Sequence, residues 1–210
     1  IHLERRQGME YIKDKPKHSE KDISLKDAVF VFSSFTFICL AVVFALIVYD
    51  VLTIHSFLSF EKPIAMAIFI VAASIGLLLF GVILTRYIPS RYIDDTNKGY
   101  QNGPLLGVFF LMFTGALFEE ILFRGIIQNL IYVFIENQWI AILATTVLFL
   151  GFHIQYFKKP IMLVNIMVPS LTFGWIYFET NNIFVPFLVH FIMNFGITLL
   201  FKYNFIRVKR

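Results

Sequence analysis

The chain has 210 residues, of which 58% are hydrophobic and only 15% are charged. Soluble domains carry roughly 25% charged residues, so this composition argues against a water-soluble globular protein and for contact with a lipid bilayer. The formal net charge is +4, but the basic residues flank apolar runs and form no stripe among aromatic residues, which argues against a nucleic-acid partner.

The first 27 residues are strongly polar. They hold seven Lys or Arg and six Asp or Glu residues, with no apolar periodicity long enough to build a core. We predict a cytosolic arm over 1–27, partly helical or disordered.

Six apolar segments follow, and most have the length of about 20 residues that a membrane-spanning helix needs. They cover residues 28–49, 64–87, 105–135, 139–157, 161–178 and 183–201. The third segment, with 31 residues, is too long for one straight span. We expect it to tilt, kink or split near residues 118–124 into a span and an inner or interfacial helix. The predicted fold class is an all-α, polytopic membrane helix bundle with about six transmembrane helices, placed in the cell membrane.

The basic residues are distributed unevenly between the two sides of this arrangement. If all six segments cross the membrane, sixteen of the eighteen Lys and Arg residues fall on one side. Lys62 falls on the other side, and Arg124 lies inside the third segment. Cytoplasmic loops are enriched in Lys and Arg, so both termini are predicted to be cytoplasmic. Residues 28–102 then form two helices and their connecting loop, and 202–210 form a basic cytosolic tail.

Three charged residues interrupt the third segment, in the stretch ALFEEILFRG. A charge at the centre of a membrane costs roughly 2.5–3.5 kcal/mol on insertion scales, so such residues are rare and usually functional. Glu120 and Arg124 are four residues apart, with the acid first, which predicts an ion pair on one helical face. Glu119 is rotated from Glu120 by about 100°, so it is free to face a cavity. The alternative is that all three residues form a structural clasp.

Three further polar residues lie in the later apolar segments. His153 is in the fourth segment, and His190 and Asn194 share one face of the sixth. Each alone is also compatible with packing, and an intramembrane Asn often joins two helices. With Glu119, however, these residues lie on three different segments, so the fold can bring them together in one cavity.

Such a set can hydrolyse a bond. A carboxylate takes a proton from water and returns it to a leaving amine, while His and Asn hold the water or donate to an oxyanion. Glu119, His153 and His190 also suit Zn²⁺ or another divalent metal with one open position. The sequence does not decide between hydrolysis with and without a metal. It contains neither HExxH, the motif of a zinc-protease helix, nor GxSxG, the motif of a serine nucleophile.

Three motifs in this half of the chain resemble a known family. EEILFRG (119–125) resembles the EExxxR motif of the CAAX prenyl protease and bacteriocin-processing family, also called the Abi family. FLGFH (149–153) is similar to its FxxxH motif, and HFIMN (190–194) to its HxxxN motif. Order and spacing agree over about residues 103–200, and the two helices before them lie outside the resemblance.

The resemblance implies an intramembrane endopeptidase whose core is 103–201 and whose substrate is a membrane-associated peptide or protein. Glu119 would activate the attacking water, and the remaining residues would support it, position the water and stabilise the tetrahedral intermediate. The implied catalytic residues are Glu119, Glu120, Arg124, His153, His190 and Asn194. Members of the family are commonly labelled metalloproteases, so a divalent metal stays an open alternative. Bacterial members include bacteriocin self-immunity proteins and peptide-pheromone processing factors.

Two other classes of function fit parts of the sequence. A non-catalytic membrane immunity or scaffold protein would not need the full set of motif residues that this chain carries. A proton-linked transporter would also use intramembrane Glu and His, but the chain shows no paired broken segments of the kind found in inverted-repeat transporters. An intramembrane endopeptidase is therefore the main hypothesis.

Overall fold

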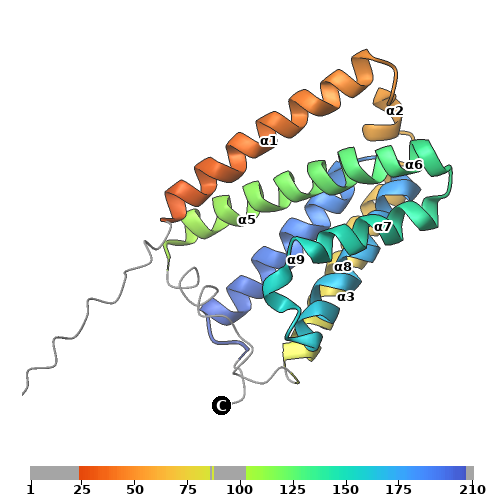
Figure 1. Ribbon diagram of the computed structural model, residues 1–210. Coiled ribbons are helices and arrows are strands. Elements are labelled where there is room, and N and C mark those ends of the chain that lie inside the picture. The colour runs from red at the N-terminus through yellow and green to blue at the C-terminus, as the bar shows by residue number, and fades with distance from the viewer. Residues whose placement is uncertain (1–23, 86, 88–102, 207–210) are drawn as a thin grey trace, which may run out of the picture.

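The computed structural model describes residues 24–85, 87 and 103–206, and every named element in these residues is a helix (Figure 1). The predicted all-α class is therefore confirmed. Most of the predicted arm and tail, and most of the loop before residue 103, lie outside the described residues. The elements are α1 (Leu25–Val48), α2 (Ile54–Phe57), α3 (Pro63–Thr85), α5 (Leu105–Glu120), η2 (Ile121–Gln128), α6 (Asn129–Ile135), α7 (Gln138–Gly151), η3 (Ile154–Tyr156), α8 (Pro160–Thr180) and α9 (Phe184–Lys202).

In the part of the chain that the structure describes, five helices are long and apolar enough to cross a membrane: α1, α3, α8, α9 and the continuous helix α5–η2–α6. The fourth predicted segment forms α7, which has 14 residues and is shorter than these spans. It ends at Gly151, a short 3₁₀ turn follows, and Pro160 then begins α8, where its fixed φ suits the first helical position. The protein is a multi-pass membrane protein.

The third apolar segment is one helix of 31 residues, Leu105–Ile135. Near residues 118–124, where we expected a tilt, a kink or a split, the helix continues without a split and takes a π-helical form over Ile121–Gln128 (Figure 1). A π-helical turn inside an α-helix is rare and often marks a functional site.

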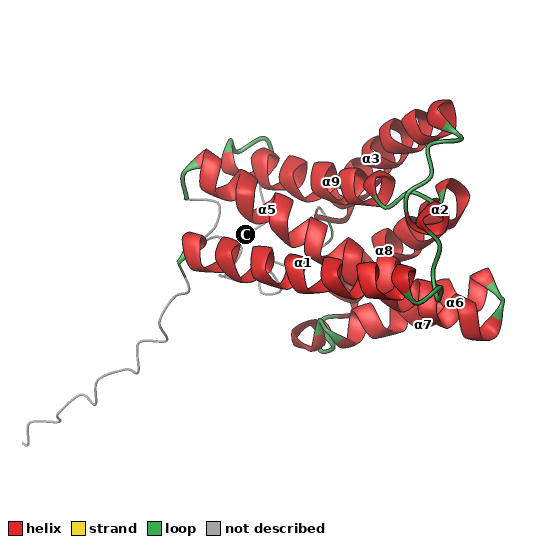
Figure 2. Ribbon diagram, turned by 90° about the horizontal axis from the view of Figure 1, so that it is seen from above, coloured by secondary structure: helices red, strands yellow, loops and turns green. Residues whose placement is uncertain are grey.

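α1 and α5 lie side by side and run in the same direction (Figures 1 and 2). The rings of Phe32 and Phe35 pack on Phe118 with centroid distances of 5.9 and 5.5 Å. At the start of α5, Lys202 Nζ at the end of α9 donates a hydrogen bond of 2.8 Å to the carbonyl of Gly103. The starts of α1 and α5 and the end of α9 thus share one end of the bundle. That this end faces the cytoplasm stays a prediction.

The opposite end of the bundle is held by α2 and the turn between α8 and α9. Leu58 and Asn182 form an isolated antiparallel bridge, and Asn182 Nδ2 donates to the carbonyl of Ser59 at 2.6 Å. The hydroxyl of Tyr177 donates to the carbonyl of Ser56 at 2.8 Å. These two side-chain donors thus pair the backbone carbonyls of Ser56 and Ser59.

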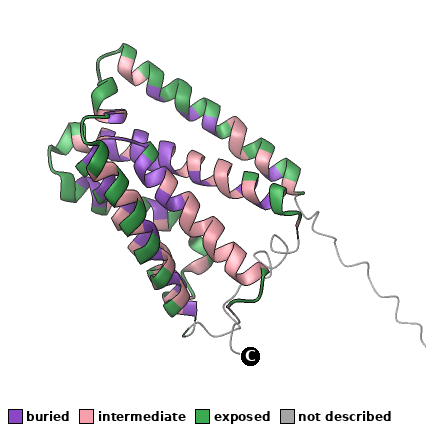
Figure 3. Ribbon diagram, turned by 180° about the vertical axis from the view of Figure 1, so that it is seen from behind, coloured by how far each residue is buried: buried purple, intermediate pink, exposed green. Residues whose placement is uncertain are grey.

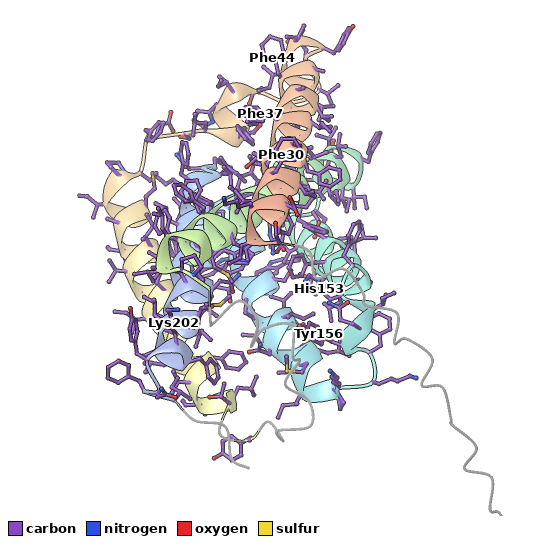
Figure 4. All side chains as sticks on the ribbon, turned by 90° about the vertical axis from the view of Figure 1, so that its left-hand side faces the viewer. Phe30, Phe37, Phe44, His153, Tyr156 and Lys202 are labelled. Atoms are coloured by element: carbon purple, nitrogen blue, oxygen red, sulfur yellow. The ribbon has the colours of Figure 1, made fainter. Side chains whose placement is uncertain are left out.

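Buried residues concentrate where η2, α8 and α9 meet, while α1 and α3 expose much of their surface (Figure 3). Phe30, Phe37 and Phe44 repeat at seven-residue intervals along the outer side of α1 and are all about 70% exposed (Figure 4). In water such a row would be unfavourable, but in a bilayer it contacts lipid. The buried residues therefore lie at the centre of the bundle, and apolar helix faces surround them.

Candidate active site

A row of polar side chains runs along the helix α5–η2 where it faces α8. Glu120, Arg124 and Gln128 recur at four-residue intervals, and all three are fully buried. Gln128 Nε2 donates to the carbonyl of Gly174 at 2.9 Å. A Cβ at Gly174 would lie only 2.7 Å from Gln128 Oε1, so the absence of a side chain there lets α8 approach the row.

Glu120 and Arg124 form the ion pair that their spacing predicts. Arg124 Nη1 donates to Glu120 Oε1 at 3.2 Å. The guanidinium carbon lies 5.3 Å from the ring centroids of both Phe149 and Phe173, so the cation is held between two aromatic rings. The pair neutralises two charges that would otherwise be costly in this environment.

His190 is bonded to the same carboxylate. Its Nδ1 lies 2.7 Å from Glu120 Oε1, and its ring stacks on Phe173 with a centroid distance of 4.8 Å. An ionised carboxylate only accepts hydrogen bonds, so Nδ1 carries the proton and donates. In the neutral imidazole, Nε2 then has a lone pair and can accept a proton.

Glu119 lies on the other side of the same imidazole. Its Oε2 is 3.7 Å from His190 Nε2, and its side chain is 24% exposed, whereas that of Glu120 is fully buried. The two adjacent acids thus differ in environment, as their helical rotation predicts. The structure adds that both approach the ring of His190, one at each nitrogen.

His153 lies in the turn after α7, where its neighbour in Figure 4 is Tyr156. Its Nδ1 lies 2.9 Å from the carbonyl of Phe149, and its ring is 4.7 Å from the Phe149 ring. Phe149 in turn contacts Arg124, so His153 is joined to the ion pair through one aromatic side chain. Within the described residues, His153 forms no hydrogen bond or ion pair with Glu119 or His190.

Asn194 lies one turn beyond His190 on α9 and is half-buried. Its backbone carbonyl accepts a hydrogen bond of 2.7 Å from the hydroxyl of Thr198. In the part of the chain that the structure describes, its side-chain amide forms no hydrogen bond. The amide is therefore available to a ligand or to water.

Comparison with known proteins gives a match over the region that contains these residues. A family model described as type II CAAX prenyl endopeptidase Rce1-like matches residues 101–196. This region of the chain is similar to the Rce1-like family. Residues 101–196, the Rce1-like region, contain all six of the predicted site residues.

A curated relative matches a similar length of chain. It is the uncharacterized protein YpbD of Bacillus subtilis (strain 168), 28% identical over 127 residues. The match covers 59% of this chain and 62% of YpbD, so it spans less than two thirds of that protein. No solved structure matches the chain.

The Rce1-like region does not present a complete set of metal ligands. Among the described residues, no group of three or more His, Cys, Asp and Glu side chains is arranged to hold a metal ion. Of the predicted ligands, atoms of Glu119 and His190 lie 3.7 Å apart, while His153 forms no hydrogen bond or ion pair with either among the described residues. A divalent metal at these residues stays a prediction.

The Rce1-like region also contains buried polar residues that the motifs do not include. Arg124 Nη2 donates to both the carbonyl and the hydroxyl of Ser170, each at 2.9 Å. Asn129 Nδ2 lies 2.6 Å from the hydroxyl of Tyr177. Gln128 could have been predicted from the sequence, because it extends the four-residue repeat of Glu120 and Arg124. No pattern in the sequence singles out Ser170 in its apolar helix.

Proposed function

We propose that the chain is an intramembrane endopeptidase that hydrolyses a peptide bond in a membrane-associated protein or peptide. The observation that carries this proposal is the imidazole of His190 between two carboxylates. Glu120 is bonded to Nδ1 at 2.7 Å, and Glu119 faces Nε2 at 3.7 Å.

The separation of Glu119 Oε2 and His190 Nε2 suits a bridging water. At 3.7 Å the two atoms are too far apart for a direct hydrogen bond. One water oxygen can lie within hydrogen-bonding distance of both. The partial exposure of Glu119 gives that water a route to the site.

In the proposed reaction, Glu119 takes one proton from this water as its oxygen bonds to the carbonyl carbon of the substrate. The carbonyl double bond opens and its electrons move to oxygen, which forms a tetrahedral oxyanion. The carbon–nitrogen bond then breaks, and Glu119 returns the proton to the leaving amine. The Asn194 amide is a candidate donor to the oxyanion, and the ring of His153 is a second one when both of its nitrogens carry a proton, since Nδ1 already donates to the Phe149 carbonyl.

Glu120 and Arg124 have a different role in this scheme. They do not contact the substrate, because both are fully buried. Glu120 holds the proton of His190 on Nδ1, so that Nε2 is left to face the water. Arg124 pairs with that carboxylate and neutralises its charge.

The family match supports peptide-bond hydrolysis and suggests which substrates to test. The matched family is described as a CAAX prenyl endopeptidase, so peptides with a prenylated C-terminal CAAX sequence are the first candidates. The same peptides without the prenyl group would show whether the lipid is needed.

The test is cleavage by the purified full chain in lipid nanodiscs, with products identified by mass spectrometry. Glu119→Gln should lower kcat by at least about 100-fold, the lower range for loss of a positioned acid–base group. The matched control is Glu179→Gln, at an acid that bonds Trp175 Nε1 near the end of α8, and it should retain activity. Undiminished cleavage by Glu119→Gln would show that this acid is not the base.

A further inference from the structure

Ser170 is a buried serine on α8 with contacts to two other helices. Its side chain is 1% exposed. Its hydroxyl donates to Thr146 Oγ1 on α7 at 3.3 Å. A hydroxyl has one proton, so with this proton directed to Thr146 the oxygen presents its lone pairs elsewhere. Ser170 therefore acts as an acceptor toward the helix α5–η2.

Those lone pairs receive Arg124. Nη2 of the guanidinium lies 2.9 Å from the hydroxyl oxygen and 2.9 Å from the carbonyl oxygen of Ser170. Nη2 has two protons, so one can be directed to each acceptor. The planar guanidinium is rigid, so fixing Nη2 also fixes the direction in which Nη1 points.

Nη1 points to the same Glu120 oxygen that accepts the hydrogen bond of His190. Arg124 Nη1 and His190 Nδ1 both donate to Glu120 Oε1, at 3.2 and 2.7 Å. A movement of the guanidinium would move this carboxylate and, through it, the imidazole. The hydrogen bonds therefore connect Ser170 with His190 through Arg124 and Glu120.

We propose that Ser170 is a positioning residue for the hydrolytic site, which acts through Arg124 and Glu120 to hold the ring of His190. This inference rests on the proposed function. Ser170 does not reach the reacting atoms in this role. Its effect is to keep His190 Nε2 aimed at the water beside Glu119.

The first measurement is of cleavage kinetics. Ser170→Ala leaves one Nη2 proton without its acceptor in a buried place, and we expect kcat to fall about tenfold with KM nearly unchanged. Ser170→Thr keeps the hydroxyl and should retain most of the activity. The matched control is Thr180→Val, which removes a buried hydroxyl of α8 that bonds only the Ile176 carbonyl of its own helix. It should leave kcat unchanged.

A double variant separates positioning from general stabilisation. If Ser170 acts through Glu120, Ser170→Ala should cause no further fall in kcat when Glu120→Gln is already present. A second full tenfold fall in that background would overturn the inference. If Ser170→Ala does not fold, Thr146→Val provides the same test, because it releases the hydroxyl proton of Ser170. It should lower kcat in the same direction by a smaller factor.

The second measurement does not depend on proteolysis. In protein with ¹⁵N-labelled histidine, the Nδ1 signal of His190, assigned with His190→Gln, should shift in Ser170→Ala and not in Thr180→Val. If the wild-type chain cleaves no peptide, the proposed function fails, and this shift still decides whether Ser170 positions His190. An unchanged Nδ1 signal in both Ser170→Ala and Thr146→Val would overturn the inference.

Discussion

Glu120 accepts hydrogen bonds from Arg124 and His190 at one and the same oxygen, Oε1, while its second oxygen is buried without a partner among the described residues. The carboxylate is therefore not only half of an ion pair. It joins the positive charge of η2 to the imidazole of α9, and the site depends on that connection.

The first prediction concerns the stability of the ion pair. Removing one partner of a buried pair costs about 3–5 kcal/mol, because the other charge is left uncompensated. We expect Glu120→Gln and Arg124→Met each to destabilise the protein by about this amount. The double variant should lose less than the sum of the two, since no charge is then left alone. The free energy of unfolding of each variant is measured in mixed micelles with an increasing fraction of SDS.

The control for this cycle is the exposed pair of His55 and Glu61, whose atoms Nε2 and Oε1 lie 3.1 Å apart. Exposed pairs contribute about 0–1 kcal/mol, so Glu61→Gln should change the free energy of unfolding little. Additive effects of the two buried substitutions would contradict the interpretation of Glu120 and Arg124 as a mutually neutralising pair.

The second prediction separates the two histidines. His190→Gln disrupts the contact with Glu120 and the stack on Phe173, so it should lower both kcat and the unfolding temperature. His153 is half-buried and bonds only a carbonyl of its own segment, so His153→Gln should lower kcat with a loss of about 1 kcal/mol or less. Thermal unfolding monitored by circular dichroism and steady-state kinetics on the same samples distinguish the two. Equal losses of stability in the two variants would contradict the expectation that His190 contributes more to the stability of the fold than His153.

Much of this architecture follows from patterns in the sequence. Among the described residues, five of the six predicted apolar segments form helices long enough to span a membrane, and the four-residue spacing of Glu120 and Arg124 brings them together on one helical face. The helical rotation that separates Glu119 from Glu120 likewise holds in the structure. These features depend on local geometry, which the sequence determines directly.

The features that could not be predicted depend on contacts between helices. Glu120 binds His190, which is 70 residues further along the chain. Arg124 binds Ser170, which is 46 residues further along. Nothing in the local sequence selects Ser170 from the other hydroxyl residues of α8. The length of the third segment predicted an irregularity near residues 118–124, but it did not predict that this would be a π-helix over Ile121–Gln128.

The third prediction concerns the end of the bundle farthest from Lys202. The Tyr177 hydroxyl is fully buried, lies 2.6 Å from Asn129 Nδ2 and donates to the carbonyl of Ser56. Tyr177→Phe removes the donor to the Ser56 carbonyl and the acceptor of one Asn129 Nδ2 proton, while Asn129 Nδ2 keeps its bond to the Gly125 carbonyl, so we expect a loss of about 1–3 kcal/mol. Tyr203→Phe is the control, because Tyr203 is 55% exposed. Hydrogen exchange at Ser56 and Phe57 should increase in Tyr177→Phe only. Unchanged exchange there would show that Tyr177 does not hold α2 in place.

The last prediction concerns the approach of α8 to the polar row. A Cβ at Gly174 would lie 2.7 Å from Gln128 Oε1 and 3.2 Å from Ile142 Cγ2, in a place enclosed by α7 and η2. Gly174→Ala should therefore push α8 outward and cost about 1–3 kcal/mol through overpacking. Because Ser170 lies one turn earlier on α8, the same displacement should lengthen its bonds to Arg124 and lower kcat.

Gly76 in α3 is the matched control for this substitution, because a Cβ there would meet nothing within 4 Å. Ala has the higher helix propensity, so Gly76→Ala should leave stability unchanged or raise it by up to about 1 kcal/mol. If Gly174→Ala and Gly76→Ala unfold at the same SDS fraction, α8 has room to accept the extra methyl. The close packing of α8 on the polar row would then not be what holds Ser170 against Arg124.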